Sequence, residues 1–213
     1  FLTVKDGGPL ASRLFERRMT DMQTGVMKAC VCMKDHSAAE VVPPPLISDL
    51  LQGDKDFIVR VYVLSGRNLL AADRNHKSDP YLRISFDKHR AGDRNKAKFK
   101  TLNPDFRQKF EFTMSLPCVS DLCIQVMDSD PLYLDEEIGR TYVDLEERVL
   151  SNVWQQLGKD SNSEQERKPV ERRTLRHPRS EKCCGQLLLW IDIVPSSQVS
   201  LYPPWSVELP KPS

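Results

Sequence analysis

The chain has 213 residues, with 31 basic and 30 acidic side chains, so its net charge of +1 selects no class of partner. This length allows one large domain or two small ones with a buried core. No apolar run reaches the roughly 20 residues of a transmembrane helix, and the chain begins at Phe1 without a signal sequence. We therefore expect a soluble fragment of a longer chain, whose electrostatic function depends on local charge clusters.

Residues 1–55 show little regular apolar pattern. They contain Gly7-Gly8-Pro9 and the run Pro43-Pro44-Pro45. This composition predicts an N-terminal linker, with one short strand near residues 26–33. The polyproline run is compatible with binding to an SH3 or WW domain, and also with a stiff spacer.

The next part of the chain has the pattern of β-strands. Apolar and polar side chains alternate with a period of two, as in half-buried strands, in segments 57–64, 81–86, 109–114 and 122–127. Turn-forming residues separate these segments, and no amphipathic helix lies between them. The pattern therefore predicts an all-β fold, namely an antiparallel β-sandwich.

Residues 146–183 are polar and basic, and we expect an inserted flexible loop there, with a short helix near residues 152–157. Residues 184–195 return to a strand pattern, with Leu187, Leu189 and Ile191 on one face. A strand needs a partner, so this segment is expected to be the last strand of the sandwich. The predicted domain is therefore 56–195, and residues 196–213 form a Pro-rich linker.

Two predicted connections between strands are rich in carboxylates. Asp73 and Asp79 lie in the first, and Asp128 and Asp130 lie in the second. Connections at one end of a sandwich meet in space, where four carboxylates repel each other unless a cation binds. Ca²⁺ accepts about six to eight oxygen ligands in irregular geometry, so it is the expected cofactor. Aspartate is also common in turns for structural reasons, and either segment alone would not indicate a metal site.

Three segments resemble the motifs of C2 domains, in the order in which that family has them. They are Asn68 to Asp73 with Lys77 to Leu82, Lys100 to Pro104 with Phe110 to Phe112, and Val126 to Asp130 with Ile138-Gly139. Further segments resemble a late C2 domain of the ferlin family, among them Arg60 to Val63, Lys88 to Arg94, Val143 to Arg148 and Gly185 to Pro195. The resemblance implies an eight-stranded C2-type sandwich. The interval before its last strand is shorter than in ferlins.

The resemblance also implies roles for single residues. The calcium ligands would be the carboxylates of Asp73, Asp79, Asp128, Asp130 and Glu136 and the carbonyls of Ala72 and Ser129. The fifth acid of the family is usually Asp, and Asp135 is the alternative to Glu136 here. Ferlins are tail-anchored proteins of vesicle fusion and membrane repair. The implied location is therefore the cytoplasmic face of a membrane, with fusion-machinery proteins as further partners.

Two sets of side chains suggest how a membrane would be bound. Leu132, Tyr133 and Leu134 lie at the predicted tip of the second acidic connection, where they could insert into lipid or fold back onto the sandwich. A basic set is predicted to attract anionic phospholipid, although a solvated surface is equally compatible. It consists of Lys88, Arg90, Arg94, Lys96, Lys98 and Lys100. Nucleic acid is not an expected partner, because aromatic residues are not interleaved with these charges.

The leading hypothesis from the sequence is a calcium-dependent phospholipid-binding module. The alternative is a calcium-independent C2 domain that binds another protein. An enzyme is not expected, because the four histidines have no recognisable Ser or Cys nucleophile motif and no phosphate-binding glycine loop occurs.

Overall fold

The computed structural model describes residues 11–15, 27–31, 55–71, 78–118, 120–130, 134–151, 153–154, 168–179 and 182–207. The chain divides into two units, Phe1–Gly53 and Asp54–Ser213. In the first unit, β1 (Ala11–Phe15) pairs antiparallel with β2 (Met27–Val31). The second strand lies within the predicted segment 26–33, whereas β1 was not predicted.

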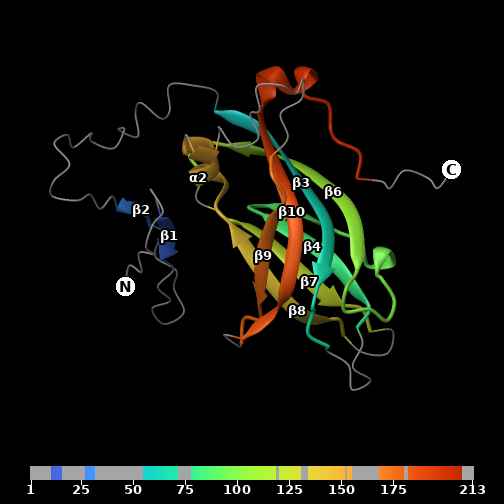
Figure 1. Cartoon of the computed structure of the whole chain (residues 1–213). Coiled ribbons are helices and arrows are strands. Elements are labelled where there is room, and N and C mark those ends of the chain that lie inside the picture. Colours follow the sequence, from blue (N-terminus) through green and yellow to red (C-terminus); the bar gives the residue numbers. More distant parts are fainter. Residues whose placement is uncertain are drawn as a thin grey trace. The chain divides into compact units, whose positions relative to one another are not determined.

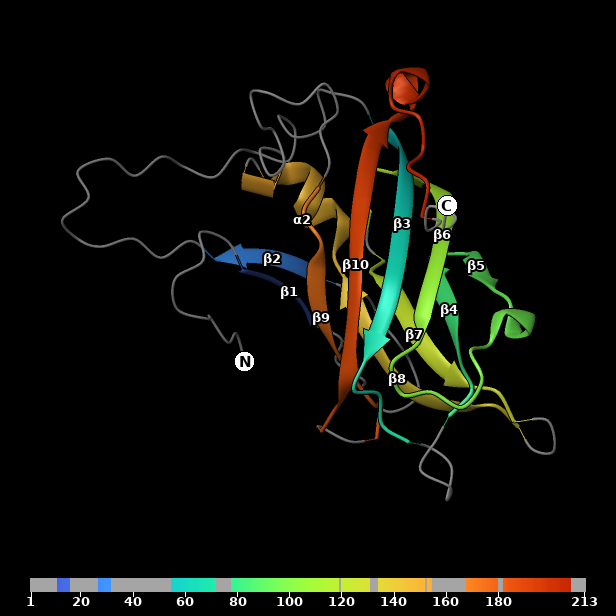
Figure 2. The same cartoon turned by 45° about the vertical axis from the view of Figure 1, so that its right-hand side comes forward.

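The second unit contains an eight-stranded antiparallel sheet in the order β5-β4-β7-β8-β9-β10-β3-β6. Its strands are β3 (Asp56–Arg67), β4 (Pro80–Phe86), β5 (His89–Gly92), β6 (Asp105–Ser115), β7 (Leu122–Asp128), β8 (Glu136–Val143), β9 (Glu171–Arg176) and β10 (Cys183–Pro195). The sheet folds over into two facing layers, with β10, β3 and β6 in one and β4, β7 and β8 in the other (Figures 1 and 2). This arrangement confirms the predicted β-sandwich.

Alternating apolar side chains of both layers form the core between them. The inward residues of β3, β4, β7 and β10 are almost fully buried, namely Val59, Val61, Val63, Leu82, Ile84, Leu122, Ile124, Val126, Leu187, Leu189 and Ile191. The rings of Phe86 on β4 and Phe112 on β6 stack with centroids 5.0 Å apart, so contact continues where the two layers meet at their edges. The period-two patterns in the sequence therefore arise because alternate residues of each strand point into this core.

Strand β10 lies between β9 and β3, in the layer that also contains β6, and it has buried residues on both faces. It pairs with β3 from Gln186 opposite Arg67 to Pro195 opposite Phe57. On the face turned away from the core, Trp190 stacks on Tyr62 with ring centroids 4.4 Å apart. Both residues are at most 1% exposed, because the chain after β10 covers them.

The covering segment begins with the 3-10 helix η2 (Ser196–Leu201). After it, the Trp205 backbone N–H donates a hydrogen bond of 3.1 Å to the Tyr62 hydroxyl, and the Arg60 guanidinium donates to the Tyr202 carbonyl. The sequence predicts a linker from residue 196 onwards. In the described part of that segment, residues 196–207, the chain instead packs on β3 and β10.

The stretch 146–183, predicted as an inserted loop, contains most of α2 (Leu145–Leu150) and all of β9. The Asp144 side chain caps the helix by accepting the Glu147 backbone N–H at 3.0 Å, which satisfies a donor of the first turn. No helix in the described residues has the length and apolar character required to cross a bilayer.

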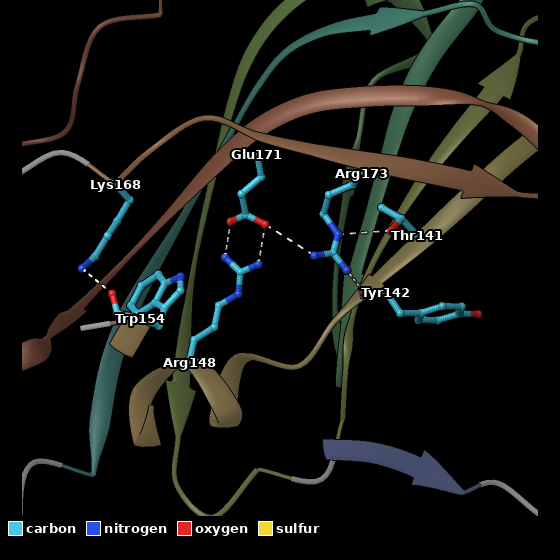
Figure 3. A network of polar contacts seen from close by, with 7 residues as sticks. All are labelled: Thr141, Tyr142, Arg148, Trp154, Lys168, Glu171 and Arg173. Carbon is cyan, nitrogen blue, oxygen red and sulfur yellow. Dashed lines mark hydrogen bonds and ion pairs between the residues drawn. The ribbon is translucent and has the colours of Figure 1, made fainter. Parts of the chain in front are cut away.

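A polar network holds α2 against the start of β9 (Figure 3). Arg148 donates two hydrogen bonds to the Glu171 carboxylate, at 2.5 and 2.7 Å. Arg173 adds a contact of 3.4 Å to the same carboxylate. The Trp154 ring lies near two cations, 5.6 Å from the Arg148 guanidinium carbon and 4.4 Å from Lys168 Nζ. These bonds fix one end of β9.

We expect Glu171→Gln to lower the free energy of unfolding by about 1–3 kcal/mol, because the Arg148 side chain is only 10% exposed and loses a charged acceptor. The matched control is Asp105→Asn, which breaks an ion pair whose partners are 42% and 55% exposed and is worth at most about 1 kcal/mol. Urea unfolding of both variants measures the difference. Equal stabilities would show that the network does not hold α2 and β9 together.

Deleting residues 196–213 should lower the free energy of unfolding by about 1–3 kcal/mol, because it exposes the outer faces of Tyr62 and Trp190 to water. Deleting only 208–213 serves as the control and leaves η2 and Trp205 in place. Urea unfolding is the measurement. If both deletions have the same stability as the intact chain, residues 196–207 act only as a linker.

Candidate functional site

Four connections meet at one end of the sandwich, here called the loop end. They are β3–β4, β5–β6, β7–β8 and β9–β10. Antiparallel pairing brings them together, since the last residue of β7, Asp128, is opposite the first residues of β4 and β8. Likewise, Arg67 at the end of β3 is opposite Gln186 near the start of β10. In Figure 2 the lower ends of β3, β7, β8 and β10 lie together at the bottom of the sandwich, and the short helix of the β5–β6 connection lies to the right above them.

Asp79 and Asp128 are joined by short hydrogen bonds. The Asp79 backbone N–H donates to Asp128 Oδ1 at 2.6 Å, and the Asp79 carbonyl accepts the Ser129 N–H at 3.1 Å. Asp79 Oδ1 in turn accepts the Lys100 N–H at 2.6 Å. Asp128 is only 4% exposed, and a buried carboxylate requires such donors. Two of the sequence-predicted calcium ligands therefore lie side by side.

Asp130 follows on the same connection and is linked to Asp135. The Asp130 backbone N–H donates to Asp135 Oδ1 at 3.3 Å. Asp135 Oδ2 accepts the Tyr81 hydroxyl at 2.8 Å, and that hydroxyl also accepts an N–H of Arg83 at 2.8 Å. Burial raises the pKa of Tyr81, and the bond to Asp135 raises it further, so the hydroxyl remains a donor at neutral pH.

Arg94 lies in the 3-10 helix η1 (Arg94–Lys96) of the β5–β6 connection and bridges to the β7–β8 connection. Its guanidinium forms an ion pair of 2.9 Å with Asp135 Oδ1 and donates to the Asp130 carbonyl. Asp135 thus has a cation and a hydroxyl as partners. The sequence placed Arg94 in a lipid-binding set and gave no sign of this pairing, which depends on a contact between distant connections.

Glu136 has a different environment from Asp135. It is the first residue of β8, it pairs in register with Asp128, and its side chain is exposed. Leu134, just before these acids, is 89% exposed. Ala72, Asp73, Leu132 and Tyr133 lie outside the described residues, so their predicted roles stay predictions.

The predicted basic set divides between two places. Arg94, Lys96, Lys98 and Lys100 belong to the connection at the loop end, where the Lys98 N–H donates to the Pro80 carbonyl at 2.9 Å. Lys88 lies in the β4–β5 turn, at the other end of β4, and Arg90 pairs with Ser85 near that turn. The two groups lie toward opposite ends of β4, and the predicted binding of anionic phospholipid by these six residues stays a prediction.

The side chains and backbone carbonyls at this end offer oxygen ligands of the kind that Ca²⁺ prefers. They comprise the carboxylates of Asp79, Asp128, Asp130 and Glu136 and the carbonyl of Ser129. Within the described ranges, which omit 72–77 and 131–133, no three His, Cys, Asp or Glu side chains are grouped closely enough to hold a metal ion. The donor chemistry fits calcium, and Asp73 would have to complete the group.

Two glycines allow the β9–β10 connection to approach the acidic connections closely. A Cβ on Gly139 of β8 would lie 3.2 Å from the Cβ atoms of Cys184 and Leu175. Gly185 has φ +115°, and a Cβ there would lie 2.8 Å from the Asn68 carbonyl oxygen. Next to it, the Leu70 N–H donates to the Cys184 carbonyl at 3.1 Å. The start of β10 is therefore packed against the first acidic connection.

Comparison with protein families gives a match to the family described as "C2 domain" over residues 57–163, half of the chain. Myoferlin of Xenopus tropicalis is 39% identical over 104 residues, which are 49% of this chain. Fer-1-like protein 4 of Mus musculus is 34% identical over 130 residues, or 60% of this chain. These matches confirm the predicted resemblance to ferlins. The chain covers only 5% and 6% of the length of these two relatives.

Solved structures agree on the fold. The tandem C2 domains, A and B, of Extended-Synaptotagmin 2 match with a TM-score of 0.51 at 18% identity, covering 80% of this chain and 51% of that chain. The calcium-bound form of the same two domains matches with a TM-score of 0.50 at 20% identity, covering 68% and 49%. At this identity the likeness concerns the fold alone.

We expect Arg94→Gln to lower the free energy of unfolding by up to about 1 kcal/mol, because Asp135, with its side chain 18% exposed, loses its cation while the arginine itself is half exposed. The effect should shrink in high salt, which screens the pair. Lys96→Gln, an exposed position in the same 3-10 helix, is the control. Thermal unfolding at low and high salt measures both, and identical, salt-independent values would contradict a role for the ion pair.

Proposed function

Because the chain belongs to the C2 domain family, we propose that it is a calcium-dependent phospholipid-binding module of a ferlin-like protein that acts in vesicle–membrane fusion or membrane repair. The observation that carries this proposal is the convergence of Asp79 and Asp128, joined by a 2.6 Å hydrogen bond, at the end of the sandwich where Asp130 also lies. Acids gathered at one end attract a divalent cation because they repel each other.

In this proposal calcium is held by oxygen atoms from both acidic connections. The ligands are the carboxylates of Asp73, Asp79, Asp128, Asp130 and Glu136, with the carbonyls of Ala72 and Ser129. The bonds from Arg94 and Tyr81 to Asp135 support Glu136 as the fifth acid, because Asp135 would first have to give up these partners. The ion would supply positive charge that neutralises the acids, and it would coordinate phosphate oxygens of lipid headgroups.

The loop end would face the membrane. Leu134 is 89% exposed there, which supports insertion of Leu132, Tyr133 and Leu134 into the lipid. Each such side chain gains roughly 1.5–3 kcal/mol when it leaves water completely. In this proposal Arg94, Lys96, Lys98 and Lys100, which belong to the connection at the loop end, attract anionic phospholipid. Lys88 and Arg90 lie toward the other end of β4.

A second candidate function is calcium-independent binding of another protein. It is favoured by the hydrogen bonds that Asp79 and Asp128 already accept from backbone N–H groups, which give both acids a structural role without a metal. In either case the domain, proposed as residues 56–195, acts by binding and not by catalysis. The proposed location is the cytoplasmic face of a vesicle or plasma membrane, with the tail anchor elsewhere in the parent chain and fusion-machinery proteins as partners.

We expect Asp130→Asn combined with Glu136→Gln to weaken calcium binding about tenfold or more, because ligand charge tunes the affinity of such sites. Asp128 remains unchanged, so its hydrogen bond to Asp79 is preserved. The control is Asp56→Asn with Asp87→Asn, two exposed acids away from the loop end. Calorimetric titration of calcium measures affinity, and sedimentation with phosphatidylserine vesicles measures lipid binding.

Calcium should also raise the melting temperature of the wild-type chain and of the control, since an ion that binds only the folded state stabilises it. If calcium changes neither the melting temperature nor the vesicle binding of the wild type, calcium dependence is wrong. Calcium-independent protein binding is then the better account.

A further inference from the structure

The connection between β9 and β10 carries a basic cluster at the loop end. Arg176 ends β9, Arg179 follows in the turn, and Lys182 precedes β10; all three are exposed. Segment 176–182 contains these three permanent cations and one acid, Glu181. We call Arg176, Arg179 and Lys182 the basic hairpin. None of them belongs to the basic set expected from the sequence.

The basic hairpin has a fixed position relative to the acidic connections. At its β10 side, the Cys184 carbonyl accepts the Leu70 N–H at 3.1 Å. At its β9 side, Leu175 packs against Gly139 of β8, two residues beyond Glu137. Within the turn, the Arg179 backbone N–H donates to His177 Nδ1 at 3.1 Å. The other end of β9 is held by the two bonds between Arg148 and Glu171 (Figure 3).

Cations therefore flank the acidic connections on two sides. The strand order separates β4, next to the β5–β6 connection, from β9 and β10 by β7 and β8. Arg94 to Lys100 thus lie on one side of Asp128 and Asp130, and the basic hairpin lies on the other. Leu134, on the β7–β8 connection between these two basic segments, is 89% exposed.

We propose that the basic hairpin is a second, calcium-independent contact for the anionic headgroups of a phospholipid membrane. This inference rests on the proposed function, because it takes the membrane to face the loop end. The charge of the basic hairpin indicates its ligand. Exposed cations repel calcium and attract the phosphate and carboxylate groups of lipid headgroups. Contact on both sides of the acidic loops would set the tilt of the domain on the membrane.

The test uses the whole chain with vesicles of phosphatidylcholine alone or mixed with phosphatidylserine, sedimented in EGTA and in calcium. The variant is Arg179→Gln with Lys182→Gln. The control is Lys55→Gln with Lys88→Gln, which removes the same charge from exposed residues at the start of β3 and at the other end of β4. The variant should bind phosphatidylserine vesicles about 10- to 30-fold more weakly in EGTA, and the control within about twofold of wild type.

The calcium-dependent gain in binding should be retained in the variant, so the two proposals fail separately. If the wild type binds equally in EGTA and in calcium, the proposed calcium dependence is wrong. Even then, weaker binding of the hairpin variant than of the control supports the hairpin contact. Equal binding of variant and control in EGTA would overturn the hairpin proposal. So would a wild type that binds no better with phosphatidylserine than without it. Equal urea midpoints of all chains establish that the variants fold.

Discussion

The pairing of β10 with β3 is the contact on which the rest of the second unit depends. It runs from Gln186 opposite Arg67 to Pro195 opposite Phe57, although about 120 to 140 residues of chain separate the partners. Closing so large a loop costs entropy, which the burial of Leu187, Leu189 and Ile191 offsets. Strand β10 also pairs with β9, and β9 pairs in turn with β8, so β9 connects the layer of β10, β3 and β6 to the layer of β4, β7 and β8.

The loop end follows from that closure. Once β10 lies beside β3, Cys184 and Gly185 meet the first acidic connection, and Leu175 meets Gly139 beside the second. The acidic side chains there are stabilised by groups that point toward them: backbone N–H donors for Asp79 and Asp128, and a cation with a hydroxyl for Asp135. Such partners allow carboxylates to remain close together at a tolerable electrostatic cost.

Sequence reasoning was most accurate where one residue's environment depends on its neighbours in the same strand. The alternation along β3, β4, β7 and β10 predicted which side chains share the face turned to the core, because successive residues of a strand point to opposite faces. It was incomplete between residues 146 and 183, where polar composition suggested a flexible loop; residues 152, 155–167 and 180–181 of that stretch lie outside the described residues, and the prediction for them stays a prediction. There α2 and β9 are held by Arg148, Glu171 and Arg173, and charged residues that bond to each other have the same composition as charged residues in solvent.

The candidate site divides in the same way. The sequence by itself determined the β-sandwich, the C2 and ferlin resemblance, and the clustering of Asp79, Asp128 and Asp130 on connections, since each depends on local periodicity or on short motifs. Only the tertiary structure decided that Arg94 pairs with Asp135, that Glu136 is exposed, and that the basic hairpin shares the loop end. These facts depend on which strand ends become neighbours, and that choice is made by burial over the whole sandwich and not by any short segment.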